Sequence, residues 1–391
     1  MSAHRALAAA IGSLALIAFA IAAARAQPSQ AGAGVANSLD LAVRHIDKNI
    51  VDEHTVDMQG IKYGAEGGEV LRDKNGLYHW FTSEQYGDPY WVANRIAHWT
   101  STDGLHWHRD PRWVKEGNHD TTGTRDRSNY FDPTMAWDAR TGYWYMFYVG
   151  YRYSTDPTAW HLAKIYRAKA MKPGPAGLSG PYHDQDSDDI EVMGPIAHPQ
   201  PYEATRVGNS SYGLGADSVT VYPVGDHWVM LYCEVMLATA PSPSGTFTRL
   251  PEGPDNPVSY GTKPMTFDPK AAPFHPERFW LENPIVARIP RGAPGAGTYL
   301  MVVGNFVDVR IAPKDKGYAF GYRPLCGWAT SPDGIRWSNV KPLDLGLGDC
   351  MTVASLLPER DGSFTMYVTA HTKGTPNFER LSRVELVATA H

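Results

Sequence analysis

The stretch that decides the fold is Phe131–Tyr153, FDPTMAWDARTGYWYMFYVGYRY. It opens with an acid followed by proline, Asp132-Pro133, and it turns at Asp138–Gly142, where the glycine can adopt the positive φ of a tight turn. The return run, Tyr143–Val149, is rich in aromatic and β-branched residues and is typical of a strand. Because both faces of this predicted hairpin are apolar, we expect it to lie between two other layers.

The same unit occurs four more times along the chain. Each copy starts with an acid, continues as a β-type run, turns at a glycine and returns as an aromatic-rich strand. The leading acids of the five copies are Glu66, Asp132, Asp217, Glu282 and Asp349. A repeat somewhat longer than the roughly 40–50 residues of familiar propeller blades predicts a blade with long loops. We therefore expect residues 41–391 to form one all-β domain, a five-bladed β-propeller.

The N-terminal part of the chain divides into three segments. Residues 1–26 have a short basic start, an apolar core and an Ala-Arg-Ala ending, which predicts a signal peptide and export to the periplasm or the exterior. A retained membrane anchor is the alternative, although the apolar core is shorter than a typical span. Residues 27–40 are predicted to be a flexible tether. His45–Val56 has the pattern of an isolated strand, and we expect it to pair beside Leu381–Ala390 and close the ring.

Net charge, cysteine content and the acidic loop indicate which partners, disulfides and cofactors to expect. The net charge is −5 at pH 7 and no basic cluster is present, so neither nucleic acid nor an anionic membrane is expected to bind. Three cysteines are too few for a disulfide scaffold; Cys326 and Cys350 either pair or remain buried thiols. The acidic loop at 184–189 lacks the glycine and glutamate of an EF-hand. No cofactor is therefore expected, with structural calcium as the alternative.

A second repeated motif, Thr-Ser-x-Asp-Gly-x-x-Trp, occurs at Thr100–Trp107 and Thr330–Trp337. Its Asp-Gly pair predicts a tight turn at the outer edge of a blade. We expect each tryptophan to cover its turn, with a role as a sugar platform as the alternative.

The leading acids are the candidate functional residues. The first strand of each propeller blade lines the central channel, so the five acids should converge on one end of it. The second strands return to that end and should bring further polar residues to its rim, namely Glu84, Arg152, Glu234, Asn305 and His371. Carboxyl groups crowded in a partly desolvated funnel cannot all ionise normally, and some pKa values rise while others stay low. Glycoside hydrolysis needs such a split between a protonated acid and an ionised carboxylate. The alternative for each acid is a structural bond to backbone N–H groups or to arginine.

Three of these hairpin starts, Asp132-Pro133, Asp217 and Glu282-Asn283-Pro284, resemble the acids on successive blades of the five-bladed glycoside hydrolases of families 43, 32 and 117. The resemblance implies a glycosidase in which Asp132 is the general base, Asp217 tunes pKa and orients the sugar, and Glu282 is the general acid. It also implies attack by water, and we expect inversion. The segment from Glu66 to Glu69 also resembles the hairpin that carries the general acid in family 43. If the order of the blades around the ring is rotated relative to that family, Glu66 takes the place of Glu282 as the general acid.

Five further residues are predicted to contact the substrate, an oligosaccharide or polysaccharide: Glu69, Arg152, Glu234, His371 and Asp349. His371 has proton donation as an alternative role, and Arg152 either neutralises the acids or binds hydroxyl groups. Two other functions stay open. One is a non-catalytic carbohydrate-binding propeller, and the other is a phosphorylase similar to glycoside hydrolase family 130, which needs basic side chains near the acids. The sequence does not indicate the sugar or the oligomeric state.

Overall fold

The computed structural model describes residues 39–89, 92–125, 127–153, 162–183, 190–193, 218–232, 236–249, 259–260, 263–264, 280–307, 314, 323–338, 340–371 and 378–390. The predicted signal peptide, the acidic loop at 184–189 and the candidate site residues Asp217 and Glu234 lie outside this set. Within it, no helix is both long enough and apolar enough to cross a bilayer.

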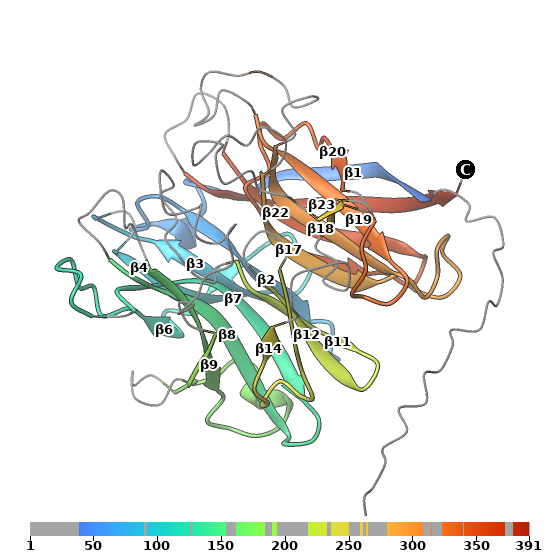
Figure 1. Ribbon diagram of the computed structural model, residues 1–391. Coiled ribbons are helices and arrows are strands. Elements are labelled where there is room, and N and C mark those ends of the chain that lie inside the picture. The colour runs from blue at the N-terminus through green and yellow to red at the C-terminus, as the bar shows by residue number, and fades with distance from the viewer. Residues whose placement is uncertain are drawn as a thin grey trace, which may run out of the picture. The chain divides into compact units, whose positions relative to one another are not determined.

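The described strands form five antiparallel sheets in the order expected of propeller blades (Figure 1). Blade one contains β2 (Ala65–Arg72), β3 (Tyr78–Gln85), β4 (Asn94–Ser101) and β5 (His108–Arg109), with β6 (Lys115–Glu116) paired to β4. Blade two contains β7 (Asn129–Asp138), β8 (Tyr143–Arg152), β9 (Leu162–Lys169) and β10 (Ile190–Met193). Blade three contains β11 (Thr220–Val224), β12 (His227–Tyr232), β13 (Met236–Ala240) and β14 (Thr248–Arg249).

Blade four contains β17 (Trp280–Arg288), β18 (Tyr299–Val307), β19 (Leu325–Ser331) and β20 (Lys341–Leu343). Blade five contains β21 (Thr352–Pro358), β22 (Ser363–Ala370), β23 (Arg380–Ala390) and β1 (Leu39–Val51). A short pair, β15 (Ser259–Tyr260) with β16 (Lys263–Pro264), and two 3₁₀ turns, η1 (Val56–Met58) and η2 (Pro175–Gly177), complete the described elements.

The first strands of the blades form a closed ring. Contacts run from β2 to β7, β11, β17 and β21 in turn, and β21 contacts β2 again. A cyclic series of neighbours places these strands around one axis, as a propeller requires. The prediction of an all-β, five-bladed propeller is confirmed.

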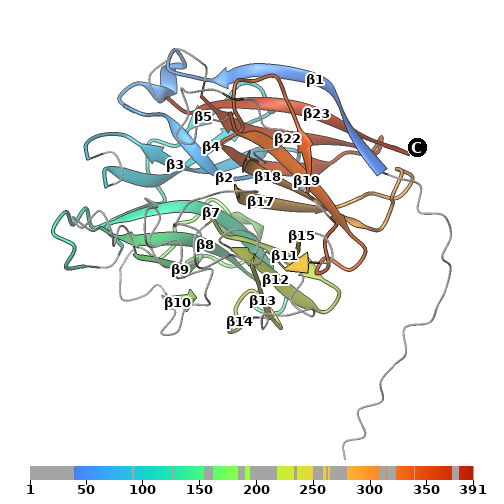
Figure 2. The same ribbon diagram turned by 45° about the horizontal axis from the view of Figure 1, so that its top comes forward.

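The N-terminal strand closes the ring. β1 lies at the outer edge of blade five and pairs antiparallel with β23, with Leu39 opposite Ala390 and Val51 opposite Leu381. Both views show the blue strand running beside the red one (Figures 1 and 2). The predicted pairing is therefore confirmed, although the strand spans Leu39–Val51 rather than His45–Val56, and residues 56–58 form η1.

A hydrophobic cluster fills each of the five interfaces between blades. Strand alternation builds them: in β8, Phe147 packs with blade three, and the adjacent Met146 and Tyr148 pack with blade one. The expectation that this hairpin lies between two layers is thus confirmed. Because the blades bury apolar side chains on both faces, they can pack around the axis without a separate central core.

Candidate active site

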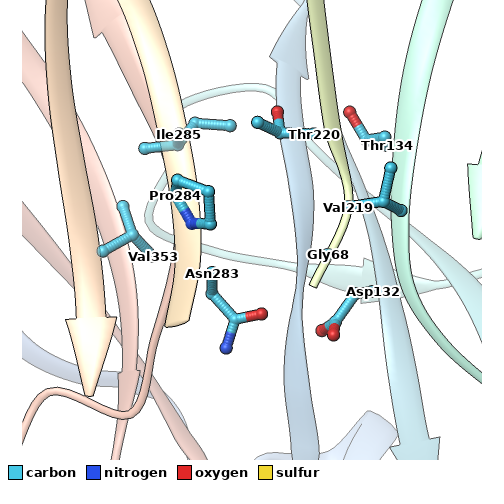
Figure 3. A pocket seen from close by; sticks show the side chains of 9 residues that line it. All are labelled: Gly68, Asp132, Thr134, Val219, Thr220, Asn283, Pro284, Ile285 and Val353. Atoms are coloured by element: carbon cyan, nitrogen blue, oxygen red, sulfur yellow. The ribbon is translucent and has the colours of Figure 1, made fainter. Parts of the chain in front are cut away.

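A small pocket lies on the central axis. It is lined from all five first strands or the residues directly before them, by Gly68, Asp132, Thr134, Val219, Thr220, Asn283, Pro284, Ile285 and Val353. Asp132 and Asn283 lie together at one end of it (Figure 3). We call this end the channel mouth, since the strands that bear the leading acids begin there.

A bulge near the start of the first strand sets the direction of these side chains. In blade two, Phe131 pairs with Val149 and Thr134 with Phe147, so β7 has one residue more than its partner. Equivalent shifts follow Glu66 in β2 and Glu282 in β17. The residue after the last regular pair is left-handed in each case, with φ of 53° at Gly67, 49° at Asp132 and 47° at Asn283.

This alignment corrects the expectation that each copy of the repeat starts with its acid at the same position. Asp132 occupies the left-handed position itself, whereas Glu66 and Glu282 each occupy the position before it, which is Phe131 in blade two. The acids therefore reach the channel mouth from two different backbone positions. Spacing along the sequence could not reveal this, because pairing with the next strand sets the register of each first strand relative to its bulge.

Glu66 lies within a group of carboxyl side chains. Its Oε2 accepts a hydrogen bond of 2.5 Å from Gln85 Nε2. Burial raises the pKa of Glu66 well above its usual range, and the negative charge of Glu379 adds to the shift. The charges of Asp132 and Glu282 raise this pKa further, while the Gln85 bond opposes them. Glu66 is therefore the carboxyl that favours the protonated form at neutral pH.

Asp132 stands directly beside the Glu66 segment. A Cβ atom placed on Gly67 would lie 3.0 Å from Asp132 Oδ1, so the two strands approach closely there. The backbone N–H of Asp132 donates to Ser83 Oγ at 3.1 Å, which ties blade two to blade one at this level. Both Glu66 and Asp132 keep part of their surface exposed. The structure thus brings Asp132 and the Glu66 segment together at the channel mouth.

Glu282 is deeper than the other two acids. Only 7% of it is exposed, and its Oε2 accepts a hydrogen bond of 3.2 Å from Asn305 Nδ2. The backbone N–H of Asn305 in turn donates to the carbonyl of Cys350 at 2.6 Å. Cys326 and Cys350 form a disulfide that joins β19 of blade four to the segment before β21, with a Cα–Cα distance of 5.2 Å. The position of Glu282 is therefore tied to both blades.

Asp349 and His371 form a charged group with Glu379, which the sequence analysis did not single out. The backbone N–H of His371 donates to Asp349 Oδ1 at 2.7 Å, and the ring Nδ1 lies 3.3 Å from Asp349 Oδ2. The other ring nitrogen, Nε2, is 3.3 Å from Glu379 Oε1. Burial lowers the pKa of His371, but the charge of Glu379 and the bond to Asp349 outweigh it and raise the pKa to about 9. The imidazole is therefore a cation at neutral pH.

Two other predicted residues, Glu69 and Arg152, face different surroundings. Glu69 Oε2 accepts hydrogen bonds from Thr134 Oγ1 at 3.0 Å and from the N–H of Met135 at 2.5 Å, so it links blades one and two. Burial raises the pKa of Glu69 to about 7, against the effect of these bonds. Arg152 Nε donates to the carbonyl of Gly123 at 2.9 Å, in the loop before β7.

The placement of Glu84 at the rim is wrong. Its carboxylate accepts from Arg95 Nε at 3.0 Å and Trp99 Nε1 at 3.1 Å, on the next strand outward. The adjacent Gln85 reaches Glu66 instead. Because side chains alternate along a strand, an error of one residue exchanges the two faces.

The two tryptophan turns belong to the scaffold. Asp103 Oδ1 accepts from the N–H groups of Leu105 and His106, both at 2.8 Å, and Asp333 makes the equivalent bonds. Trp107 and Trp337 are only 4% and 7% exposed. The prediction that they cover the turns is confirmed. Within the described part of the chain, no group of three or more metal-ligating side chains is arranged to hold an ion.

Comparisons with known proteins address the fold. No protein-family model and no curated protein matches the sequence. Among solved structures, a protein in an RGII complex superposes with a TM-score of 0.53 at 15% identity, covering 89% of this chain and 92% of that one. A fructofuranosidase from Schwanniomyces occidentalis, complexed with fructosylnystose, gives 0.52 at 13% identity over 89% of this chain and 60% of that one.

An exo-β-1,3-galactanase from Clostridium thermocellum superposes with a TM-score of 0.50 at 14% identity, over 87% of this chain and 62% of that one. This chain has the propeller fold of the five-bladed glycoside hydrolases. It spans about three fifths of the galactanase and of the fructofuranosidase, so part of each lies beyond the match.

Proposed function

We propose that this protein is a glycosidase that hydrolyses a glycosidic bond at the channel mouth. The observation that carries the proposal is the closeness of two carboxyl groups: Asp132 lies beside the Glu66 segment, and burial and negative neighbours raise the pKa of Glu66 well above its usual range. A proton donor next to a second carboxyl group is the arrangement that glycoside hydrolysis uses.

In this mechanism Glu66 is the general acid and Asp132 the general base. Glu66 gives its proton to the glycosidic oxygen as the bond to the anomeric carbon breaks. Asp132 takes a proton from a water molecule, whose oxygen attacks the anomeric carbon from the opposite face and inverts its configuration. This keeps Asp132 in its predicted role and replaces Glu282 by Glu66 as the acid, because Glu282 is almost fully buried under Asn305. Asp217 lies outside the described residues, and its proposed role as pKa modulator rests on the sequence alone.

The test is hydrolysis of aryl glycosides of arabinose, xylose, galactose, fructose and anhydrogalactose by the mature chain. We expect Glu66→Gln and Asp132→Asn each to lower kcat by about 10²–10⁴-fold, the usual contribution of general acid–base catalysis. Glu359→Gln is the matched control, because Glu359 pairs with Arg72 between blades and is not part of the cluster. The anomer released first, followed by NMR, reports the stereochemistry. Unchanged turnover in both site variants would reject the assignment, and sugar binding without hydrolysis would favour the carbohydrate-binding alternative.

Phosphorolysis is less well supported by the arrangement of cations. Both ring nitrogens of His371 already face carboxylates, and Arg152 Nε donates to the carbonyl of Gly123. If turnover required inorganic phosphate, phosphorolysis would be favoured over hydrolysis.

We further propose that the enzyme works outside the cytoplasm. The signal-like segment at residues 1–26 supports this, and so does the disulfide between Cys326 and Cys350, since such bonds persist in oxidising compartments. Cell fractionation with sequencing of the mature N-terminus tests it. Full-length chain retained in the cytoplasm would contradict it.

A further inference from the structure

A carboxyl group that belongs to no repeat start lies beside Glu66. Glu379 stands just before β23 and is 2% exposed. It forms a parallel bridge with Gly64, and its N–H donates to the carbonyl of Tyr63 at 3.1 Å. A Cβ atom on Gly64 would lie 2.4 Å from the carbonyl oxygen of Glu379, so this approach requires glycine.

The bridge places Glu379 close to the segment that bears Glu66. Gly64 precedes Glu66 by two residues, and its missing side chain is what lets the backbone of Glu379 approach this segment. From this position the negative charge of Glu379 acts on the carboxyl group of Glu66.

The other side of Glu379 is held by a cation. His371 Nε2 lies 3.3 Å from Glu379 Oε1, and Asp349 holds the opposite edge of the imidazole through Nδ1 at 3.3 Å. Burial raises the pKa of Glu379 itself, and the positive charge of His371 opposes that shift. The pairing with His371 therefore favours the ionised form of Glu379, whose charge acts on Glu66.

We propose that Glu379, fixed by His371 and Asp349, is a positioning residue that keeps the carboxyl group of Glu66 in its proton-carrying form. This inference rests on the proposed function of Glu66 as the proton donor. Three negative groups face Glu66 from separate elements: Asp132 on β7, Glu282 on β17 and Glu379 before β23. Glu379 is the one that does not approach the substrate site from a first strand, so its charge can act on the donor without occupying the channel.

The first experiment follows the titration of Glu66 by carboxyl ¹³C NMR in the full mature chain, compared with Glu379→Gln. The glutamine keeps the shape of the side chain but removes its charge, so the titration midpoint of Glu66 should fall by roughly one pH unit or more. The alkaline limb of the kcat/KM profile should move down by the same amount, with KM little changed. Glu379→Asp, which keeps the charge, should retain most of the high midpoint.

Glu53→Gln is the matched control. Glu53 forms an ion pair with Arg380, the residue next to Glu379, but it is not among the groups that raise the pKa of Glu66. This variant should lose some stability and leave the Glu66 midpoint unchanged. An unchanged midpoint in Glu379→Gln, or an equal shift in both variants, would overturn the inference.

A measurement on the unaltered protein decides the case if Glu379→Gln does not fold. Imidazole NMR should show His371 protonated well above pH 7, with a midpoint at about 9. A midpoint near the ordinary 6.5 would mean that the carboxylates do not hold the ring, and the inference would fail. These titrations need no substrate, so they are separate from the hydrolysis assay. A shifted Glu66 midpoint without hydrolysis would leave the charge network standing and overturn the proposed function.

Discussion

Carboxyl groups at the channel mouth and at the outer turns of the blades have opposite proton affinities. At the outer turn of blade one, the N–H and ring of His106 and the N–H of Leu105 hold the pKa of Asp103 well below its usual range. At the channel mouth, burial and like charges raise the pKa of Glu66. Both are acids at repeated positions of one fold. The comparison teaches that donors directed at a carboxylate make it a scaffold group, whereas burial among other carboxylates makes it a group that can hold a proton.

Replacing one left-handed glycine in each region should reduce activity in the first case and stability in the second. The loss of activity is the largest effect we expect. Gly67, with φ of 53°, lies at the channel mouth, where a Cβ would press on Asp132 Oδ1 at 3.0 Å. Gly67→Ala should lower kcat/KM by about 100-fold, because small displacements of a catalytic group cost that much. Gly104, with φ of 73°, lies at the outer turn, and its added Cβ would meet Tyr367 Oη at 2.3 Å.

Gly104→Ala should therefore lower the free energy of unfolding by about 2–3 kcal/mol through backbone strain and loss of the Tyr367 bond, with kcat retained. Steady-state kinetics and urea unfolding on the two variants give the answer. If Gly104→Ala were the one that lost activity, the division between the two regions would be wrong.

Removing a carboxyl group should affect stability in opposite directions in the two regions. Asp103→Ala deletes an acceptor for the N–H groups of Leu105 and His106 and should cost about 1–2 kcal/mol of unfolding free energy. Glu66→Gln removes a buried acid from among like charges, so it should leave stability unchanged or raise it. Urea unfolding at neutral pH measures both. A large loss of stability in Glu66→Gln would show that the cluster is structural.

Glu69 combines features of both regions, and its effect should appear as a dependence of stability on pH. Its folded pKa is raised by burial from 4.5 to about 7, so the folded state holds the proton more tightly than the unfolded chain. The stability from this group is complete below about pH 4.5 and is lost as the pH rises through 7. Glu69→Gln can still accept bonds from Thr134 and Met135, and its thermal midpoint relative to the wild type should be higher at about pH 8 than at about pH 4.5. A constant difference between the two pH values would contradict the shift.

The blades were predictable because their signals are local. An aromatic-rich hairpin such as Phe131–Tyr153, apolar on both faces, must be covered on both sides, and five copies of it close a ring. The last hairpin of the sequence has too few strands after it to complete a blade, and this predicted that β1 pairs with β23. The Asp-Gly turns and their tryptophans were equally readable, because bonds such as Leu105 N–H to Asp103 join residues two positions apart.

The candidate site was less predictable because its directions depend on register. The exchange of Glu84 for Gln85 is an error of one residue in an alternating strand. Relative to the equivalent bulges in blades one and two, Glu66 and Asp132 lie one position apart. Nothing in the sequence marks Glu379 as a site residue, since it begins no repeat and approaches the Glu66 segment through a bridge to Gly64, far away along the chain.

The sequence by itself determined that five apolar hairpins stack around an axis and that their acids begin at a shared end, because hydrophobic period and turn chemistry act between near neighbours. Only the tertiary structure decided which carboxyl group holds the proton. The pKa of Glu66 depends on burial and on charges brought from blades two, four and five, and such energies are set by distance in space rather than by order along the chain.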